Sequence, residues 1–361
     1  MTFYAEPQYS RNRVDQAGHR AAEGYETAED VMVIENWRAA HAQLLNTFKQ
    51  ILYNRVRKTP SFLVQRLKRR PTIIDKLSRD PSTSVRLSQM QDIAGCRVIV
   101  DNLDHLYQFK KLMDEGQFNH ELKYEKDYIK EPKSDGYRGI HQIYQYQVEP
   151  RKGHASEHQP WNGMRVEIQY RTVSQHIWAT AVETAGLLTT NNPKFKQGSK
   201  SFVDFFAVCS EMIARYAENS NSCMKSATNS HLIDEFNRLN AETHVIDIFE
   251  NVNAQVTGDK FDKTSILIFH SEDSEGGSRV EVRSYDSINV GIRDYNILER
   301  EFSGKADLVL VKADAQENMR SAYRNYFADT TDFVQTIRSA MIDLPPRDPI
   351  ILKSTISSSA A

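Results

Sequence analysis

The sequence predicts an α/β protein that ends in a smaller α+β module, and three observations lead to this prediction. Between residues 61 and 188, apolar segments with strand-like alternation take turns with segments of helical periodicity. Residues 201–255 show helical periodicity alone, and from about residue 260 two strand-like segments return, joined by a polar turn. Apolar residues make up 40% and charged residues 26% of the 361 residues, which is typical of a globular protein.

The first sixty residues are predicted to contain a tail and a long helical segment. Residues 1–28 are polar and show no clear periodicity, so we expect a mobile tail or a loosely docked arm. Residues 29–58 place apolar side chains at helical spacing, which predicts one long helix or two, and Pro60 ends this segment.

The middle of the chain carries four predicted strands and three predicted helices. SFLVQRLKRR is a short strand that runs into a basic segment, and Pro71 suits the first turn of the helix that follows. DIAGCRVIV and MRVEIQYRT are compact strands, each followed by a helix, with Asp101 or Asn102 as the N-cap of the first of these helices. The turn-rich segment DYIKEPKSDGYRGIHQIYQYQV leads from a loop into the remaining strand.

The C-terminal third is predicted to contain two helices, at 201–217 and about 230–255, and then a small module. TSILIFH and RVEVRSY form a hairpin, NILEREF a short helix, ADLVLVKAD a strand, and SAYRNYFADTTDFVQTIRSAM a closing helix. In chain order, we expect a polar tail at 1–28, the main domain at 29–200, a helical connector at 201–258, the α+β module at 259–345 and a tail at 346–361.

Charge and cysteine content exclude several classes of protein. The net charge of −2 gives no overall attraction to nucleic acid or membrane, so any basic site must be local. Three widely spaced cysteines without a CxxC pair argue against a disulfide scaffold or a zinc site and fit a reducing cytoplasm. No apolar run approaches about 18 residues, so we expect no membrane span.

Residues 55–79 are the most strongly charged part of the chain. The basic residues are Arg55, Arg57, Lys58, Arg66, Lys68, Arg69, Arg70, Lys76 and Arg79, and Asp75 is acidic. Like charges this close repel one another, so the segment predicts a polyanionic ligand, against the alternative of a solvated basic helix face. Arg66 and Lys68 are alternate strand positions and therefore point to one side together.

Two carboxylates belong to strands or their ends, where burial is costly without a cation. Asp92 precedes the strand GCRVIV, and Glu167 lies within RVEIQYRT, where Gln169 and Arg171 share its face. Mg²⁺ prefers oxygen ligands and is usually held by one or two carboxylates with substrate phosphates, so the pair predicts a Mg²⁺ site. Each acid taken alone also fits a surface or salt-bridged residue.

The loop DYIKEPKSDGYRGIH combines glycines, cations and an aromatic side chain. Gly136 and Gly139 allow unusual backbone dihedrals and close approach. The other polar and aromatic residues of interest are Lys130, Lys133, Tyr137, Arg138 and His141. An aromatic ring among cations can stack on a base while its neighbours hold phosphates, and the alternative is a plain surface loop.

Taken in order, these segments resemble the synthetase domain of the RelA/SpoT family, the alarmone synthetases. The matching pieces are RLKRRPTIIDKL, DIAGCRVIV, DYIKEPKSDGYRGIH and VEIQYRT followed by QHIWATAVE, within about residues 50–190. The resemblance implies a nucleotidyltransferase-like mixed sheet flanked by helices. It also implies a pyrophosphokinase that moves the β,γ-pyrophosphate of ATP to the 3′-hydroxyl of GDP or GTP, making (p)ppGpp. Synthesis without hydrolysis is expected, because the N-terminal half lacks room for a hydrolase domain and no His-Asp dipeptide occurs.

The resemblance further implies roles for individual residues. Asp92 and Glu167 match the carboxylates that hold Mg²⁺, and Glu167 also fits the base that takes the proton of the attacking hydroxyl. The residues expected to bind ATP are Arg66, Lys68, Lys76 and Arg97, of which the two arginines sandwich adenine. The residues expected to bind the acceptor are Lys133, Tyr137, Arg138, His141 and Gln169, with Tyr137 stacked on guanine.

Two alternatives remain open at this point. Some small family members resemble toxins that pyrophosphorylate the 3′ end of tRNA, and the YRGIH variant and the basic segment permit this, with the C-terminal module as an inhibitor or a sensor of phage proteins. A catalytically inactive module that binds nucleotides or partner proteins is the other alternative, and the presence of both acids argues against it. Small synthetases resemble tetramers in organisation, so a homo-oligomer is expected unless the long C-terminal half replaces that interface.

Overall fold

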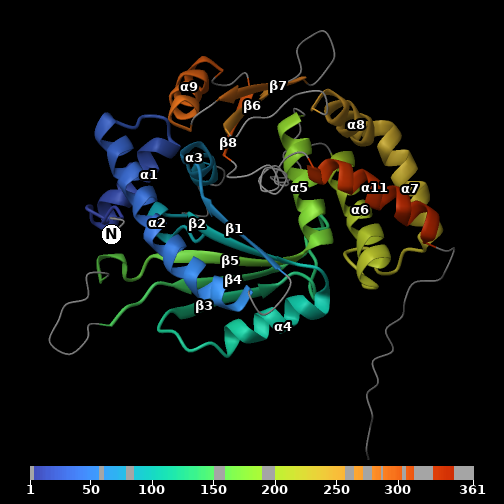
Figure 1. Cartoon of the computed structure of the whole chain (residues 1–361), viewed down its shortest axis with the longest axis horizontal. Coiled ribbons are helices and arrows are strands. Elements are labelled where there is room, and N and C mark those ends of the chain that lie inside the picture. The colour runs from blue at the N-terminus through green and yellow to red at the C-terminus, as the bar shows by residue number, and fades with distance from the viewer. Residues whose placement is uncertain are drawn as a thin grey trace, which may run out of the picture. The chain divides into compact units, whose positions relative to one another are not determined.

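The computed structural model divides the chain into two compact units, each described here by itself. Unit 1 comprises Met1–Glu131 and Arg138–Val173, and unit 2 comprises Pro132–Tyr137 and Ser174–Ala361 (Figure 1). The structure describes residues 4–56, 61–78, 85–149, 159–188, 200–256, 264–270, 279–285, 288–302, 306–312 and 328–344. The short loop at 132–137 therefore groups with the C-terminal part of the chain, although the residues on both sides of it belong to unit 1.

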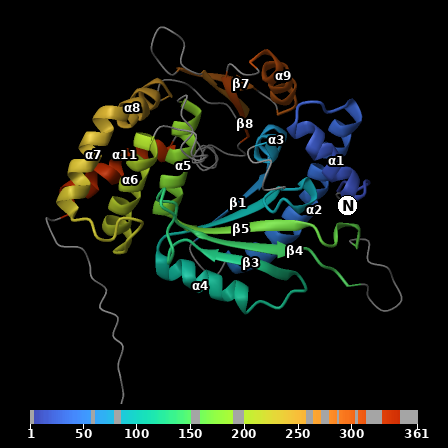
Figure 2. The ribbon, with the colours of Figure 1, turned by 180° about the vertical axis from the view of Figure 1, so that it is seen from behind.

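Unit 1 is built on a five-stranded sheet. Its strand order is β1 (Ser61–Leu67), β2 (Ala94–Val100), β5 (Arg165–Thr172), β4 (Ile140–Gln145) and β3 (Glu121–Asp127) (Figure 2). Strands β2 and β5 pair in parallel, and the other neighbours pair antiparallel. The sheet is therefore mixed, which confirms the predicted class of a mixed sheet flanked by helices.

Two helices cover the apolar face of this sheet. In β5, the side chains of Val166, Ile168 and Tyr170 lie on one face, and each is at most 1% exposed. The ring centroid of Phe109, in α4 (Leu103–Asp114), lies 5.9 Å from that of Tyr170. The ring centroid of Phe48, in α2 (Ala28–Val56), lies 5.6 Å from that of Tyr144. The register of β4 and β5 places Tyr144 opposite Val166, so both helices pack on one face. The polar residues of β5 point to the other face.

The N-terminal segment differs from the expected mobile tail. Residues Arg11–Ala22 form α1, and the Oγ atom of Ser10 accepts a hydrogen bond from the backbone N–H of Arg13 as its N-cap. Val14, Ala17 and Ala21 are buried against the main hydrophobic core of unit 1. These small residues recur at helical spacing, but each buries little apolar area. The sequence of this segment therefore shows no clear apolar periodicity.

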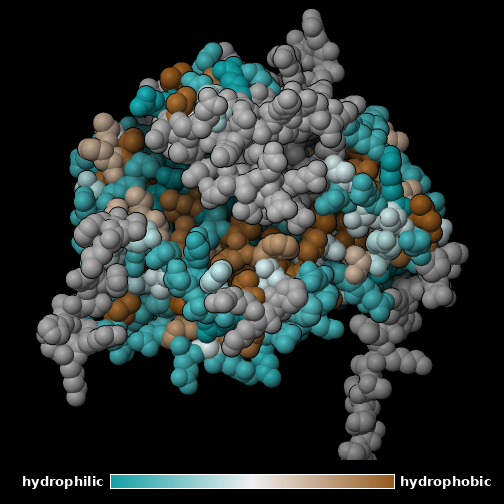
Figure 3. All heavy atoms as spheres, viewed as in Figure 1, coloured by the Kyte–Doolittle hydropathy of each residue, from teal (hydrophilic) through white to brown (hydrophobic). Residues whose placement is uncertain are grey.

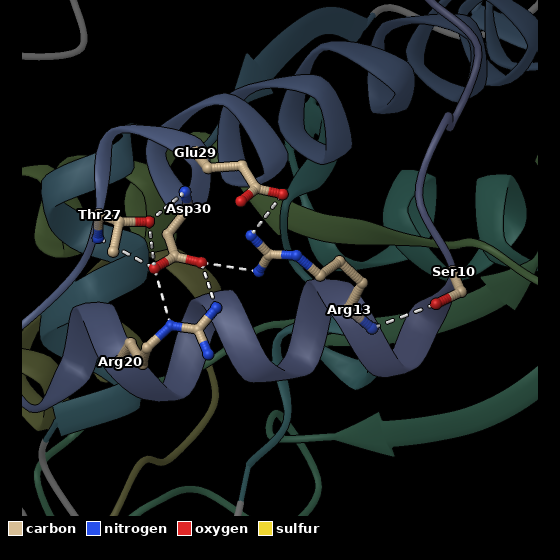
Figure 4. A network of polar contacts seen from close by, with 6 residues as sticks. All are labelled: Ser10, Arg13, Arg20, Thr27, Glu29 and Asp30. Carbon is tan, nitrogen blue, oxygen red and sulfur yellow. Dashed lines mark hydrogen bonds and ion pairs between the residues drawn. The ribbon is translucent and has the colours of Figure 1, made fainter.

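Asp30, in the first turn of α2, joins this helix to α1 through a buried carboxylate. Its side chain is fully buried and accepts hydrogen bonds from Arg13 Nη1 at 2.7 Å and from Arg20 Nε at 2.8 Å (Figure 4). The hydroxyl and backbone N–H of Thr27 also donate to Asp30, each at 2.9 Å. The hydrogen bond from Arg20 is the largest of several contributions that outweigh burial and hold the pKa of Asp30 well below its usual range.

Unit 2 contains a group of helices and a small sheet. The helices are α5 (Val173–Leu188), α6 (Lys200–Glu218), α7 (Asn229–Thr243), α8 (Val245–Val256), α9 (Ile288–Glu301) and α11 (Ala328–Asp343). The sheet has the order β7 (Arg279–Tyr285), β6 (Thr264–His270) and β8 (Ala306–Lys312), with both pairs antiparallel. The predicted hairpin of β6 and β7 is therefore confirmed.

Two C-terminal elements differ from the sequence-based prediction. Residues 230–255, expected as one helix, are divided into α7 and α8 at His244, whose backbone is left-handed with φ 55°. The closing helix α11 packs on helices rather than completing the small sheet module. Its Phe333 ring lies 5.9 Å from Phe206 of α6 and 5.9 Å from Phe249 of α8. Residues 321–327 of the predicted closing helix lie outside the described residues.

Hydrophilic and hydrophobic side chains alternate over the visible surface of the described residues (Figure 3). Within the described part of the chain, we find no helix whose length and hydropathy would let it cross a membrane.

Candidate active site

Asp92 is held between two lysine side chains in unit 1. The Nζ atom of Lys68 donates to Oδ2 of Asp92 at 2.9 Å, and the Nζ atom of Lys76 donates to Oδ1 at 2.9 Å. Burial alone would raise the pKa of this carboxyl group, but the two ammonium groups outweigh it and lower the pKa of Asp92 to about 2. Asp92 is therefore ionised at neutral pH, and 22% of its side chain remains exposed.

The backbone around Lys68 is fixed by hydrogen bonds at the end of β1. Its N–H donates to the carbonyl of Ile93 at 2.8 Å, and its own carbonyl accepts from Nε of Arg38, in α2, at 2.7 Å. Lys76 reaches the same carboxylate from the last turn of α3 (Arg70–Ser78). Two side chains, from the end of β1 and from α3, therefore converge on Asp92, which lies just before β2.

Most of the predicted site residues of unit 1 share one face of the sheet. The register pairs Arg66 with Gly95 and Gly95 with Glu167, so these residues form one row across β1, β2 and β5. Residues paired across neighbouring strands project to the same face. The next row pairs Arg97 with Gln169, and Gln169 with His141 of β4. All of these polar side chains therefore lie opposite the face that α2 and α4 cover.

Hydrogen bonds connect this polar face into one network around Glu167. His141 Nδ1 lies 2.8 Å from Oε1 of Glu167, and Gln169 Nε2 donates to Oε2 at 2.7 Å. Gln169 Oε1 in turn accepts from Arg97 Nε at 3.2 Å and from Arg171 Nη2 at 2.9 Å. The acid, the amide and the guanidinium that strand alternation predicts as one row are therefore in contact.

The environment keeps Glu167 ionised. Burial raises its pKa, but the hydrogen bond and charge of His141, helped by Gln169, outweigh burial and lower the pKa of Glu167. The negative charge of Asp92 opposes this lowering, so the two carboxylates interact electrostatically. An ionised carboxylate only accepts hydrogen bonds, and His141 therefore carries its proton on Nδ1 in this contact.

The two carboxylates fit a hard cation such as Mg²⁺, whose protein ligands are usually one or two carboxylates supplemented by substrate phosphates. Within the described part of the chain, no group of three or more His, Cys, Asp or Glu side chains could hold a metal ion. A site made from Asp92 and Glu167 alone would therefore depend on ligands from a nucleotide.

The predicted acceptor residues Lys133 and Tyr137 lie in the loop that belongs to unit 2. Lys133 Nζ lies 5.0 Å from the centre of the Tyr137 ring, an arrangement typical of a cation–π contact. Trp178 of α5 meets the same ring edge-on, with 6.3 Å between centroids. Gly136 has φ +90°, in agreement with the unusual backbone dihedrals predicted for it.

Other residues of the basic segment have separate partners. Arg55 donates to the carbonyls of Leu112 and Ile51, and Arg70 pairs with Glu26. Arg138, which was expected to bind the acceptor, is only 3% exposed. Arg57, Lys58 and Arg79 lie outside the described residues. Among the described residues of the segment, Lys68 and Lys76 are the ones that bind Asp92.

Sequence reasoning did not identify three supporting residues. Arg38 donates to the Lys68 carbonyl from thirty residues upstream, Trp178 meets the Tyr137 ring edge-on, and Ser210 donates to the Gly136 carbonyl from α6. Trp178 is also buried, at 6% exposure. No local pattern marks these residues, because each acts through a partner distant in sequence.

Part of the chain is similar to known proteins. Residues 65–187 match the family model described as the region found in RelA/SpoT proteins. GTP pyrophosphokinase YjbM of Bacillus subtilis (strain 168) is 32% identical over 119 residues, which cover 33% of this chain and 53% of that protein. GTP pyrophosphokinase YwaC of the same organism is 30% identical over 118 residues, covering 32% and 52%.

The chain spans about half the length of these curated relatives. Among solved structures, small alarmone synthetase 1 from Bacillus subtilis bound to its product pppGpp has 24% identity and a TM-score of 0.42, covering 51% of this chain and 93% of that one. A GTP pyrophosphokinase family protein from Streptococcus pneumoniae has 23% identity and a TM-score of 0.41, covering 50% and 87%. All eleven predicted site residues lie within residues 65–187, the part of the chain that matches this family model.

Proposed function

We propose that this chain is a pyrophosphokinase that transfers the β,γ-pyrophosphate of ATP to the 3′-hydroxyl of GDP or GTP. The observation that carries the proposal is the polar sheet face, where Glu167 is bound by His141 and Gln169, together with the lysine-bound carboxylate of Asp92 just before β2. The names of the two curated relatives, both GTP pyrophosphokinases, support the same chemistry. Homologous regions of this kind share a reaction more often than a particular acceptor, so the acceptor needs its own test.

The reaction needs positioning and charge stabilisation more than covalent help from the protein. The 3′-oxygen of the acceptor attacks the β-phosphorus of ATP, the bond between that phosphorus and the α,β-bridging oxygen breaks, and AMP leaves. The hydroxyl proton passes to the Glu167 carboxylate, which can accept a proton because it is ionised. Mg²⁺ held by Asp92 and Glu167 would neutralise the charge of the phosphate oxygens.

Lys68 and Lys76 have a double role in this proposal. Each ammonium group binds one carboxylate oxygen of Asp92. The triphosphate of ATP carries more negative charge than a single carboxylate and attracts the same ammonium groups more strongly. When the phosphates bind the lysines, both oxygens of Asp92 become available as cation ligands.

Base recognition is assigned to planar side chains. Arg66 and Arg97 project from neighbouring strands on one face of the sheet, which suits two guanidinium planes that enclose adenine. Tyr137, with Lys133 beside its ring, suits stacking on the guanine of the acceptor.

The experiment that tests this function measures AMP release. Purified protein is mixed with ATP and Mg²⁺, with and without GDP, and the nucleotides are separated by anion-exchange chromatography. We expect AMP to form only when GDP is present, together with an equal amount of ppGpp, and the Glu167→Gln variant to form neither. AMP without acceptor, or no AMP in any mixture, would contradict the proposal.

A further inference from the structure

The loop at 132–137 is anchored to helix α6 by a buried hydroxyl group. Ser210 Oγ donates a hydrogen bond to the carbonyl of Gly136 at 2.6 Å. The same oxygen lies 2.8 Å from Oγ of Ser222, and since the single proton of Ser210 is used, Ser222 donates this second bond. Ser210 is 4% exposed and Ser222 is fully buried, so water cannot replace these bonds at little cost.

The loop lies against α6 at a distance that only glycine permits. A Cβ atom on Gly136 would lie 2.8 Å from the Cβ of Ser210, 3.0 Å from the Cα of Ala207 and 3.1 Å from the carbonyl oxygen of Phe206. Two of these neighbours are helix backbone atoms, which cannot move aside as a side chain can. The positive φ of Gly136 adds a second reason why a larger residue would be strained there.

A buried charge network fixes the other side of this contact. Both Ser222 and Met224 donate their backbone N–H to Oε2 of Glu211, at 2.8 and 2.9 Å. Oε1 of Glu211 accepts from Arg215 Nε at 2.8 Å, and Arg215 Nη1 donates to Asn229 Oδ1, at the start of α7, at 2.7 Å. A buried network whose members are paired favours one arrangement of the chain. The turn that carries Ser222 is therefore held to α6 independently of the loop.

The aromatic part of the loop has support from the same helix. Trp178 Nε1 donates to the carbonyl of Phe206 in α6 at 2.7 Å, which sets the orientation of the indole ring. That ring then meets Tyr137 edge-on. Helix α6 thus fixes the loop twice, through the Gly136 carbonyl and through Trp178.

We propose that Ser210 and Ser222 are positioning residues for the acceptor, and that α6 with the turn after it determines how tightly the guanosine nucleotide binds. The proposal rests on the assignment of Tyr137 and Lys133 to the acceptor in the proposed function. The serines act only through the backbone of the loop, and the predicted ATP residues Arg66, Lys68 and Arg97 all lie in the other unit. Loss of the hydroxyl groups should therefore affect the acceptor and leave ATP binding unchanged.

The test combines kinetics with hydrogen–deuterium exchange in the Ser210→Ala variant. The matched control is Ser201→Ala, which removes a hydroxyl group from the same helix whose partner is Glu242. A buried hydrogen bond is worth about 1 kcal/mol, so we expect the KM for GDP to rise about five-fold in Ser210→Ala. The KM for ATP should stay within two-fold, and Ser201→Ala should match the wild type in both constants.

Exchange is measured without substrate, so it tests the anchor even if no transfer occurs. We expect the amides of residues 133–137 to exchange faster in Ser210→Ala than in the wild type or Ser201→Ala, and Ser222→Ala to show the same effect more weakly. Unchanged exchange in both serine variants would overturn the anchor. Equal changes in the KM values for GDP and ATP would overturn the claim that the serines act on the acceptor alone. A wild-type protein without transfer activity would contradict only the proposed function.

Discussion

The Nδ1 atom of His141 lies 2.8 Å from Oε1 of Glu167, on the polar face of the sheet. In the register of β4 and β5, His141 stands opposite Gln169, so its ring leans along the sheet by two residues to reach Glu167. Side chains at such diagonal positions are within reach of each other when they are long or aromatic. Burial raises the pKa of Glu167, and the contact with His141 lowers it. The ionisation of the proposed base therefore depends on His141.

Replacement of His141 should change the pH dependence of transfer. Its hydrogen bond favours the ionised form of Glu167, so its loss raises the pKa of Glu167, and less of the base is ionised at any acidic pH. We expect the acidic limb of kcat/KM against pH to move to higher pH in His141→Phe. His141→Gln retains a side-chain donor and should lie closer to the wild type. Identical acidic limbs in all three proteins would show that His141 does not control this group.

Removal of either carboxylate should abolish transfer without loss of the fold. We expect Asp92→Asn and Glu167→Gln each to lower the transfer rate by at least about 100-fold, the scale of losing a group that stabilises the transition state. Asp101→Asn is the matched control, because the Asp101 side chain is 53% exposed at the end of β2. Circular dichroism should be the same for all three variants. Activity within a few-fold of the wild type in either carboxylate variant would eliminate the proposed metal site.

Tyr137→Ala should weaken use of the acceptor more than use of ATP. Stacking of a base on an aromatic side chain is worth about 1–3 kcal/mol, so the KM for GDP should rise about ten-fold or more. Tyr137→Phe retains the ring and should stay near the wild type, which makes it the control for loss of the hydroxyl group. Steady-state kinetics with each substrate varied in turn provides the measurement, and equal increases in both KM values would refute the stacking assignment.

Asp30→Asn should destabilise unit 1 without lowering activity per folded molecule. The change leaves the charges of Arg13 and Arg20 without their buried partner. These arginines are 21% and 30% exposed, so we expect a loss of about 2 kcal/mol, below the cost of breaking a fully buried pair. The measurement is the urea midpoint of unfolding. Glu29→Gln, at a 65% exposed position that also contacts Arg13, should shift that midpoint little; equal shifts would contradict the special role of Asp30.

The strands of the polar sheet face could be predicted from the sequence because each carries a clear alternation. In β5, Val166, Ile168 and Tyr170 alternate with Glu167 and Gln169, and this alone places the acid and the amide on one face. The edge strand β3 was not predicted, because five of its seven residues are exposed and it has no apolar face. Helix α1 was not predicted, because its buried side chains are small.

Contacts between distant residues could not be predicted in the same way. Lys68 and Lys76 were expected to bind ATP, and nothing in their spacing indicates that both also reach Asp92. Ser210 and Gly136 are 74 residues apart, and their hydrogen bond depends on how α6 packs within unit 2. Such pairs follow from tertiary packing, which a local pattern does not encode.

The measurement that tests the central claim most directly is an acceptor screen with γ-labelled ATP and Mg²⁺. GDP, GTP and deacylated tRNA are offered in separate mixtures, with the Glu167→Gln variant as the blank. The γ-phosphate travels with the transferred pyrophosphate, so the label marks the acceptor. We predict labelled products with GDP or GTP and none with tRNA. Label on tRNA alone, or on no acceptor at all, would contradict the account of this chain as a pyrophosphokinase of free guanosine nucleotides.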